Sequence, residues 1–365
     1  MRYKYKHRPH TNNLFIITLV LVFLGLVSVA NVSAPNAITL HADKFYFAKQ
    51  HIIWATVGIG ALIGVSMIST SLWKKLTVPL FFASIILLVL VLVPSVGSEI
   101  FGARRWIVIG GFSIQPSEIS KLALVLFVAK VASSKKGYLS YFLPIGITSF
   151  LIILQPDLGT TLLIVAIGMS QVFISGVNPI YVGAMSFLGG LLATFFVIFS
   201  DYRKQRLLTF LHQTSDPLGE GYHIRQILIA LASGGIFGVG LGQSRQKYLF
   251  LPEVCTDSVF AIIAEEVGFV GAMLILFLLL LYLYQGIKIA WSADDVFDKV
   301  LSVGLLTWIG GQMFLNIGSM VALIPLTGIP LPFFSCGGSS LVMILIATGI
   351  LLSISKNAKA KKRKK

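Results

Sequence analysis

Asp257 is the residue of this chain whose type and position most favour chemistry. It ends the stretch Lys247-Tyr-Leu-Phe-Leu-Pro-Glu-Val-Cys-Thr-Asp257 and stands directly before a long apolar segment, in a chain that contains few charges. A carboxylate at the edge of a membrane is costly unless it has a partner or a task. Spacing alone leaves two roles open, a proton acceptor and a cap of the following helix with an ion-pair partner. For Glu265 and Glu266, about two turns further along, we expect buried ion pairs or hydrogen bonds rather than chemistry.

Several basic residues lie on or near the predicted outer face, although Lys and Arg usually accumulate in the cytoplasmic segments of membrane proteins. They are Arg104, Arg105, Lys121, Arg203, Lys204, Arg206, Arg225, Arg245 and Lys247. Cations in such places indicate an anionic ligand, because arginine side chains match phosphate oxygens. For Arg104 and Arg105, an anchor at the membrane interface beside Trp106 is the open alternative. Glu118 and Lys121 are three residues apart on one helical face, so we expect them to pair.

Polar residues and glycines also mark where helices begin. Ser117 is expected to cap a helix whose first turn contains Glu118, and Asp157 is expected to cap a later one. The glycine-rich stretch 234–242 lacks the Gly-Lys-Ser/Thr ending of a nucleotide-binding loop. Flexible backbone beside a ligand or close helix packing is the better interpretation of these glycines.

The elements that must position these residues are membrane helices. Hydrophobic residues make up 56% of the chain and charged residues 12%, against roughly a quarter charged in soluble domains. Apolar runs long enough to cross a bilayer recur throughout, which predicts an all-α polytopic bundle of about ten spans in a single domain, residues 1–365. The expected cores are Leu14–Ala30, Ile52–Ser69, Leu76–Val93, Ile119–Ala132, Phe142–Leu154, Leu158–Ser175, Pro179–Ser200, Ser258–Gly286, Val300–Ile324 and Ser340–Ser355.

Basic residues predict the orientation. Both termini are basic, and Lys and Arg accumulate in cytoplasmic segments, so both ends, including the tail 356–365, are expected in the cytoplasm with an uncleaved first span. The segment 201–257 then forms a large extracytoplasmic loop, in which the apolar run Ile224–Ala232 suits an interfacial or re-entrant helix. The net charge of +15 fits topology and anionic lipid, and the short tail without interleaved aromatic residues speaks against nucleic-acid binding.

Seven segments together resemble the SEDS family, the FtsW, RodA and SpoVE group of bacterial peptidoglycan glycosyltransferases, and most of all its FtsW (cell-division) branch. They run in family order, and the set is far more specific than any one of them. The segments are Gly102-Ala-Arg-Arg-Trp106, Gln115-Pro-Ser-Glu118 with Lys121, Gln155-Pro-Asp-Leu-Gly-Thr160, Asp216-Pro-Leu-Gly219, Leu251-Pro-Glu-Val-Cys-Thr-Asp257, Glu265-Glu266, and Pro325-Leu-Thr-Gly-Ile-Pro-Leu-Pro-Phe-Phe-Ser-Cys-Gly-Gly-Ser-Ser340.

The resemblance implies a multi-pass enzyme of the bacterial cytoplasmic membrane that polymerises lipid II into glycan on the outer face. Its implied partners are polyprenyl-diphosphate-linked glycan, a class B penicillin-binding protein (a transpeptidase), and other division or elongation proteins. Asp257 matches the family's catalytic aspartate. Residues expected to contact substrate are Arg104, Arg105, Glu118, Lys121, Arg206, Arg245, Lys247 and Ser339. Whether the role lies in division, elongation or sporulation, which partner it takes and how long its glycans are stay open.

The implied reaction needs a base and stabilised negative charge. A carboxylate can take the proton of an attacking sugar hydroxyl, and cations stabilise the departing diphosphate. An α-linked donor and a β-linked product imply direct inversion. Diphosphate and carboxylate oxygens suit a divalent cation, Mg²⁺ or Mn²⁺, although no dedicated metal motif is visible and no cofactor is assigned.

The chain departs from the family pattern beside the expected site. Cys255 stands where the family has His, Ser258 where it has Phe, and Cys336 where it has Tyr. We expect the two cysteines to be neighbours near the outer cavity. A disulfide, which the outer compartment permits, and two buried free thiols both remain open.

Two other functions compete with the enzyme. A lipid-linked precursor flippase needs polar groups along a path through the bilayer, whereas here the charged residues gather at one mouth. A non-catalytic scaffold of the division machinery has little support beyond the basic tail. The charge distribution therefore favours surface chemistry.

Overall fold

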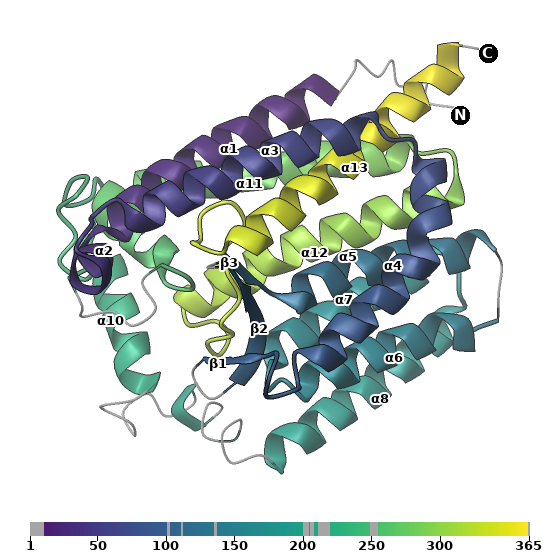
Figure 1. The fold of residues 1–365 in the computed structure, drawn as a ribbon, viewed down its shortest axis with the longest axis horizontal. Coiled ribbons are helices and arrows are strands. Elements are labelled where there is room, and N and C mark those ends of the chain that lie inside the picture. The colour runs from purple at the N-terminus through teal and green to yellow at the C-terminus, as the bar shows by residue number, and fades with distance from the viewer. Residues whose placement is uncertain are drawn as a thin grey trace.

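The computed structural model describes residues 11–100, 103–110, 112–134, 137–199, 204, 208–210, 220–248 and 255–363. Helices dominate it (Figure 1). They are α1 (Thr11–Val32), α2 (Ala34–His41), α3 (Tyr46–Met67), α4 (Thr70–Leu90), α5 (Pro116–Ser133), α6 (Leu139–Ile153), α7 (Leu158–Ile174), α8 (Pro179–Ile198), α10 (Glu220–Ser233), α11 (Val259–Ser292), α12 (Val296–Met320) and α13 (Gly338–Arg363). Three short strands are β1 (Ser98–Ile100), β2 (Ala103–Ile109) and β3 (Phe112–Ile114).

The predicted class, a helical membrane protein, is confirmed. Seven described helices, α1, α3, α4, α8, α11, α12 and α13, are long and apolar enough to cross a membrane, and α6 and α7 are shorter apolar helices. Each predicted core coincides with one helix, and the predicted interfacial run Ile224–Ala232 lies within α10. The exact number of spans stays a prediction, because α5 contains three charged residues, Glu118, Lys121 and Lys130, and α6 and α7 are short.

The bundle has two distinct ends (Figure 1). Helix α1 begins and α13 ends at the same end, which we call the terminal end. Helices α2 and α10 and the three strands lie at the opposite end, which we call the loop end. Helix α13 packs along α3, and α1 along α11. Helix α5 contacts α4, α6, α7 and α12 and is buried along almost its whole length.

Small and polar residues let the central helices approach closely. The side-chain amide of Gln171 in α7 donates to the carbonyl oxygens of Val125 in α5 and Val300 in α12, at 2.9 and 3.2 Å. A Cβ on Gly304 would meet this amide. Close backbone approach and interhelical hydrogen bonds are the usual means of packing helices in lipid, so one glutamine joins three helices at the centre of the bundle.

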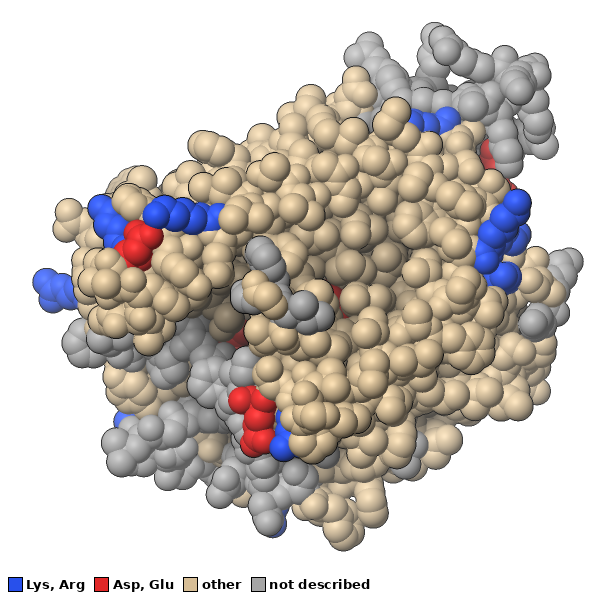
Figure 2. All heavy atoms as spheres, viewed as in Figure 1, with Lys and Arg blue, Asp and Glu red and all other residues tan. Residues whose placement is uncertain are grey.

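The surface agrees with a membrane setting. Figure 2 shows a face whose middle is uncharged on the outside, while charged side chains gather toward its ends and the acidic atoms visible near the centre lie recessed. Large apolar residues such as Phe187 in α8 are exposed. An exposed apolar surface of this extent is stable only against lipid or a partner.

The strands at the loop end were not anticipated. The loop Pro94–Glu118 contains an antiparallel sheet in the order β1-β2-β3, in which Glu99 pairs with Arg104 and Val108 with Ser113. The run from Trp106 to Ile109 is aromatic and β-branched, which suits a strand. The aromatic and β-branched run is short and follows an apolar span, so the sequence alone did not predict a strand there.

Helix α11 is broken near its start. Gly268 has a φ of 69° inside the helix, and the segment 235–240 replaces the lost helical hydrogen bonds. Two amides of this segment donate to the carbonyls of Glu265 and Glu266 at 3.0 and 3.1 Å, and two amides beyond the break donate back at 2.9 and 3.1 Å. A Cβ on Gly238 would clash with the carbonyl of Glu266. The glycines thus serve close backbone packing, and irregular backbone in a membrane protein is tolerated when its polar groups are satisfied in this way.

The contact of α1 with the α12–α13 loop generates a prediction. A Cβ on Gly25 would overlap the backbone carbonyl of Phe333, a buried loop residue. Gly25→Ala is therefore expected to lower the free energy of unfolding by about 1–3 kcal/mol, measured by thermal or denaturant unfolding in detergent. The matched control is Gly60→Ala in α3, where nothing lies within 4 Å of the new atom and the helix gains propensity. Equal stability of the two variants would contradict this packing.

Candidate functional site

Asp257 lies at the loop end, in a turn formed by residues 255–257 directly before α11. It is partly exposed. The N-cap residue of α11 is Ser258, so Asp257 does not hold the capping position that was its structural alternative. A partly exposed carboxylate at the end of a buried helix is placed to meet a ligand from outside.

The turn is fastened to the loop between α12 and α13 by hydrogen bonds. The side-chain amide of Asn316 in α12 donates to the backbone carbonyls of Asp257 and of Ile329, both at 2.9 Å. The hydroxyl of Ser335 donates to the carbonyl of Thr256 at 2.7 Å. Because the turn, α12 and the loop share these bonds, the backbone position of Asp257 is set by segments far away in sequence.

Gly328 faces the carboxylate. It has a φ of +68°, and a Cβ placed on it would lie 3.5 Å from Oδ2 of Asp257. On the other side of the loop, a Cβ on Gly159 in α7 would come within 2.7 Å of the carbonyl oxygen of Thr327. The loop therefore lies between the start of α7 and Asp257, and glycine leaves room beside the carboxylate.

Asp157 caps α7, as predicted. Its carboxylate accepts hydrogen bonds from the amide and the hydroxyl of Thr160, at 2.9 and 2.8 Å. Arg105 in β2 fixes the preceding turn, since its guanidinium donates to the carbonyl oxygens of Gln155 and Pro156 at 2.9 and 2.6 Å. The guanidinium of Arg105 is thus held by backbone at the start of α7, whereas Arg104 pairs with Glu99 at 3.1 Å and stays partly exposed.

The predicted pair of Glu118 and Lys121 is confirmed. Their side chains are 2.7 Å apart and each is only 2% exposed, and the Lys121 ammonium also lies 5.2 Å from the centre of the Trp308 ring. The predicted cap by Ser117 is wrong. Pro116 is the first helical residue, which places Ser117 inside the first turn, and within the described residues its hydroxyl has no hydrogen-bond partner.

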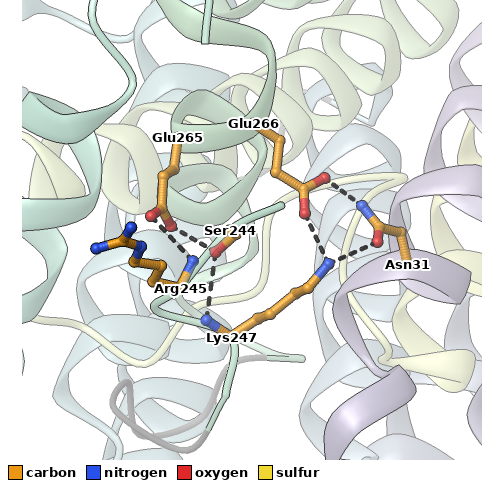
Figure 3. Close-up of polar contacts among 6 residues, drawn as sticks. All are labelled: Asn31, Ser244, Arg245, Lys247, Glu265 and Glu266. Atoms are coloured by element: carbon orange, nitrogen blue, oxygen red, sulfur yellow. Dashed lines mark hydrogen bonds and ion pairs between the residues drawn. The ribbon is translucent and has the colours of Figure 1, made fainter. Parts of the chain in front are cut away.

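Glu265 and Glu266 make the buried contacts that were predicted (Figure 3). Glu265 accepts from the hydroxyl of Ser244 and from the amide of Arg245. Glu266 accepts from the ammonium of Lys247 at 2.9 Å and from the side-chain amide of Asn31. The same ammonium donates to Asn31 at 2.9 Å. The two carboxylates therefore hold the segment 244–247 against α11 and α1.

The remaining predicted residues occupy different settings. Arg245 is exposed, while Lys247 is buried in the ion pair just described. Ser339 lies at the start of α13, buried, with a hydroxyl that has no hydrogen-bond partner in the described part of the chain. Arg206 lies outside the described residues. The side chains of Arg104 and Arg245 can reach an anion from solvent without breaking a buried ion pair, whereas Lys247 cannot.

Asn316 and His223 are not among the predicted site residues, yet Asn316 contacts the backbone of Asp257 and His223 contacts the neighbouring Ser258. Nε2 of His223 in α10 lies 2.8 Å from the hydroxyl of Ser258, which joins α10 to the start of α11. A polar amide deep in an apolar span is a usable signal for Asn316, because such side chains commonly bind another segment. No local pattern predicts the contact of His223, since it joins two segments across a long loop.

The metal-binding side chains that the structure describes do not gather at this site. Among the described residues, no three His, Cys, Asp or Glu side chains are placed to hold one ion. A divalent cation normally takes several oxygen ligands, so the described side chains do not fit a resident protein-held metal.

Two relatives cover nearly the whole chain. The family of FtsW, RodA and SpoVE, described as cell cycle proteins, matches residues 11–360. Stage V sporulation protein E of Bacillus subtilis (strain 168) is 42% identical over 357 residues, which are 94% of this chain and 96% of that protein. The probable peptidoglycan glycosyltransferase FtsW of Geobacter metallireducens is 35% identical, over 95% of this chain and 94% of that protein.

Solved structures show the same architecture. A chain of a peptidoglycan synthase complex, described as coordinating polymerization and crosslinking, superposes with a TM-score of 0.77 at 29% identity, covering 95% of this chain and 97% of that one. The rod shape determining protein RodA of Thermus thermophilus superposes with a TM-score of 0.70 at 28% identity, covering 94% and 96%.

The ion pair of Lys247 and Glu266 generates a prediction. Their side chains are 4% and 2% exposed, and removal of one charge leaves the other buried. Lys247→Met is therefore expected to lower the free energy of unfolding by about 3–5 kcal/mol, and the double variant with Glu266→Gln is expected to recover much of it. Denaturant unfolding of the single and double variants measures the coupling.

A surface pair serves as the control. Lys49 and Asp43 are 2.7 Å apart but 66% and 39% exposed, so Lys49→Met should leave stability almost unchanged. If Lys247→Met behaves like Lys49→Met, the buried pair does not hold the segment 244–247.

Proposed function

Because this chain belongs to the FtsW, RodA and SpoVE family, we propose that it is a peptidoglycan glycosyltransferase. It polymerises lipid II at the outer face of the bacterial cytoplasmic membrane, and Asp257 acts as general base. The observation that carries the role of Asp257 is its partly exposed carboxylate, held at the loop end by hydrogen bonds of its turn to α12 and the α12–α13 loop. The relatives' names support the reaction class.

In the proposed reaction, the 4-hydroxyl of the acceptor N-acetylglucosamine attacks the anomeric carbon of the donor sugar. The proton of this hydroxyl passes to the carboxylate of Asp257, a new carbon–oxygen bond forms, and the bond to the lipid diphosphate breaks with its electrons. A positioned carboxylate of this kind contributes about 10²–10⁴-fold. Inversion at the anomeric carbon follows when base and leaving group lie on opposite faces of the sugar.

The leaving diphosphate needs cations that are free to approach it. Arg104 and Arg245 suit this role best among the described residues, since both side chains reach solvent and arginine binds phosphate in a bidentate manner. Arg206 is proposed for the same role from sequence. Lys247 and Arg105 are proposed to support the site indirectly. Lys247 holds the segment 244–247 against Glu266 of α11, and Arg105 holds the turn at Pro156 before α7.

Glu118 and Lys121 are proposed to orient either Asp257 or the saccharide, and Ser339 is proposed to contact the saccharide. One carboxylate oxygen of Glu118 and the hydroxyl of Ser339 are buried without a hydrogen-bond partner among the described residues. Unmet polar atoms of this kind cost stability and are natural contacts for sugar hydroxyl and amide groups. Since the described side chains do not form a metal site, no step is assigned to a divalent cation.

The proposed partner is a class B penicillin-binding protein, which crosslinks the glycan that this chain polymerises. The similarity to a chain of a peptidoglycan synthase complex supports an assembly of this kind. Other division or elongation proteins are proposed as further partners. The basic residues at the terminal end support a cytoplasmic location for both termini, and the position of Asp257 at the opposite end supports an extracytoplasmic site.

The charge pattern favours surface chemistry over transport. In the described helices, charged side chains lie within about two turns of a helix end, whereas a flippase needs polar groups along the whole path. A scaffold without catalysis assigns no chemical role to the partly exposed carboxylate of Asp257.

The role of Asp257 is tested with purified protein, its transpeptidase partner and labelled lipid II. Asp257→Asn keeps the size of the side chain but cannot accept the proton, so glycan formation is expected to fall by about 10²–10⁴-fold. The matched control is Asp43→Asn in the α2–α3 loop, which should polymerise like the parent chain. Unchanged polymerisation by Asp257→Asn, with unfolding behaviour like that of the parent chain, would remove this residue from the mechanism.

A further inference from the structure

The only two cysteines of the chain lie side by side next to Asp257, as predicted. The backbone amide of Cys336 donates to the carbonyl oxygen of Cys255 at 2.8 Å, which brings the two residues into contact. Both are free and only partly buried. Cys255 lies in the turn that contains Asp257, and Cys336 lies in the loop that ends at α13.

We propose that Cys255 and Cys336 are a site of reversible disulfide formation that fastens the turn of Asp257 to the α12–α13 loop. The proposal rests on the outer location of this site under the proposed function, because disulfides persist outside the cytoplasm and not within it. It assigns to the pair a role beyond the glycosyltransferase reaction, namely a covalent bond beside the catalytic turn.

The chemistry is thiol–disulfide exchange with an oxidised dithiol protein or a small disulfide. One thiolate attacks a sulfur of the oxidant, which gives a mixed disulfide and releases one oxidant thiol. The second cysteine then attacks the mixed disulfide and releases the other oxidant thiol. Two cysteine thiols are oxidised, one oxidant disulfide is reduced, and both protons end on the oxidant.

The order of attack follows from the surroundings. Contact with the Cys255 thiol, together with burial, holds the pKa of the Cys336 thiol well above its usual range. A thiol that resists deprotonation is a slow nucleophile. We therefore expect the mixed disulfide to form first on Cys255 and to be resolved by Cys336.

A disulfide here would preserve the geometry of the site. The same two segments are already joined by the amide of Cys336 and by the hydroxyl of Ser335, which donates to Thr256. Phe333 and Phe334, directly before them, are buried. The crosslink closes a loop of about 80 residues, and long loops lose the most unfolded-state freedom. Oxidation should therefore stabilise the turn without stopping polymerisation.

The test uses the full-length protein in native membranes and in detergent. Alkylation with N-ethylmaleimide before and after reduction, followed by peptide mass measurement, counts the blocked thiols. After treatment with oxidised glutathione we expect both peptides to be unlabelled until dithiothreitol is added, and the midpoint of thermal unfolding to rise by several degrees. Cys255→Ser and Cys336→Ser each serve as matched controls, in which the remaining thiol stays open to alkylation after dithiothreitol and oxidation brings no rise in midpoint.

Two outcomes would overturn the proposal. One is that both thiols of the parent chain remain alkylated after oxidation, and the other is that the disulfide forms without raising the unfolding midpoint. In addition, Cys255→Ser should speed the alkylation of Cys336 at fixed pH, because it removes the thiol contact that raises the pKa of Cys336. An unchanged rate would contradict the assigned order of attack. These readouts do not depend on glycan formation, so they stand apart from a failure of the glycosyltransferase proposal.

Discussion

The carboxamide of Asn316 donates two hydrogen bonds, to the carbonyls of Asp257 and Ile329, and the geometry of the candidate site depends on it. Both carbonyls belong to irregular backbone at the loop end of the bundle. An unsatisfied buried carbonyl costs about 1–3 kcal/mol, so the amide both stabilises the two segments and fixes their distance. The loop then presents Gly328 to the carboxylate, which leaves space for a substrate on the same side.

Buried charge imposes a second constraint on the same end of the molecule. Lys121 is neutralised by Glu118, and Lys247 by Glu266. Burial of an unpaired charge at this depth costs a large amount of free energy, so each buried lysine requires a buried carboxylate beside it. The break of α11 at Gly268 provides backbone carbonyls that the segment 235–240 uses, and this places the segment 244–247 within reach of the two glutamates. Broken helix, glycine-rich segment and ion pair thus form one connected structure that supports the start of α11.

The membrane-spanning helices could be predicted from the sequence because each is a long apolar run, whereas the short helix α2 was not anticipated. The cap by Asp157 and the pair of Glu118 and Lys121 were also predictable, since both contacts lie within one turn of a helix. Contacts between distant segments were not predictable from local pattern. Asn316 reaches Asp257 only after three helices have packed, and His223 reaches Ser258 across a long loop. The cap expected from Ser117 failed because α5 begins at Pro116, two residues before the start that a cap at Ser117 requires.

The structural role of the two Asn316 hydrogen bonds is most directly tested by the rate of glycan polymerisation in Asn316→Leu. Leucine matches the shape of asparagine but cannot donate to either carbonyl, so the turn of Asp257 is expected to shift relative to the loop. A displacement of about 1 Å is enough to lower a rate by about a hundredfold. We expect a loss of this order, measured with lipid II at a temperature at which the variant remains folded. A folded Asn316→Leu variant that polymerises as fast as the parent chain would contradict the account.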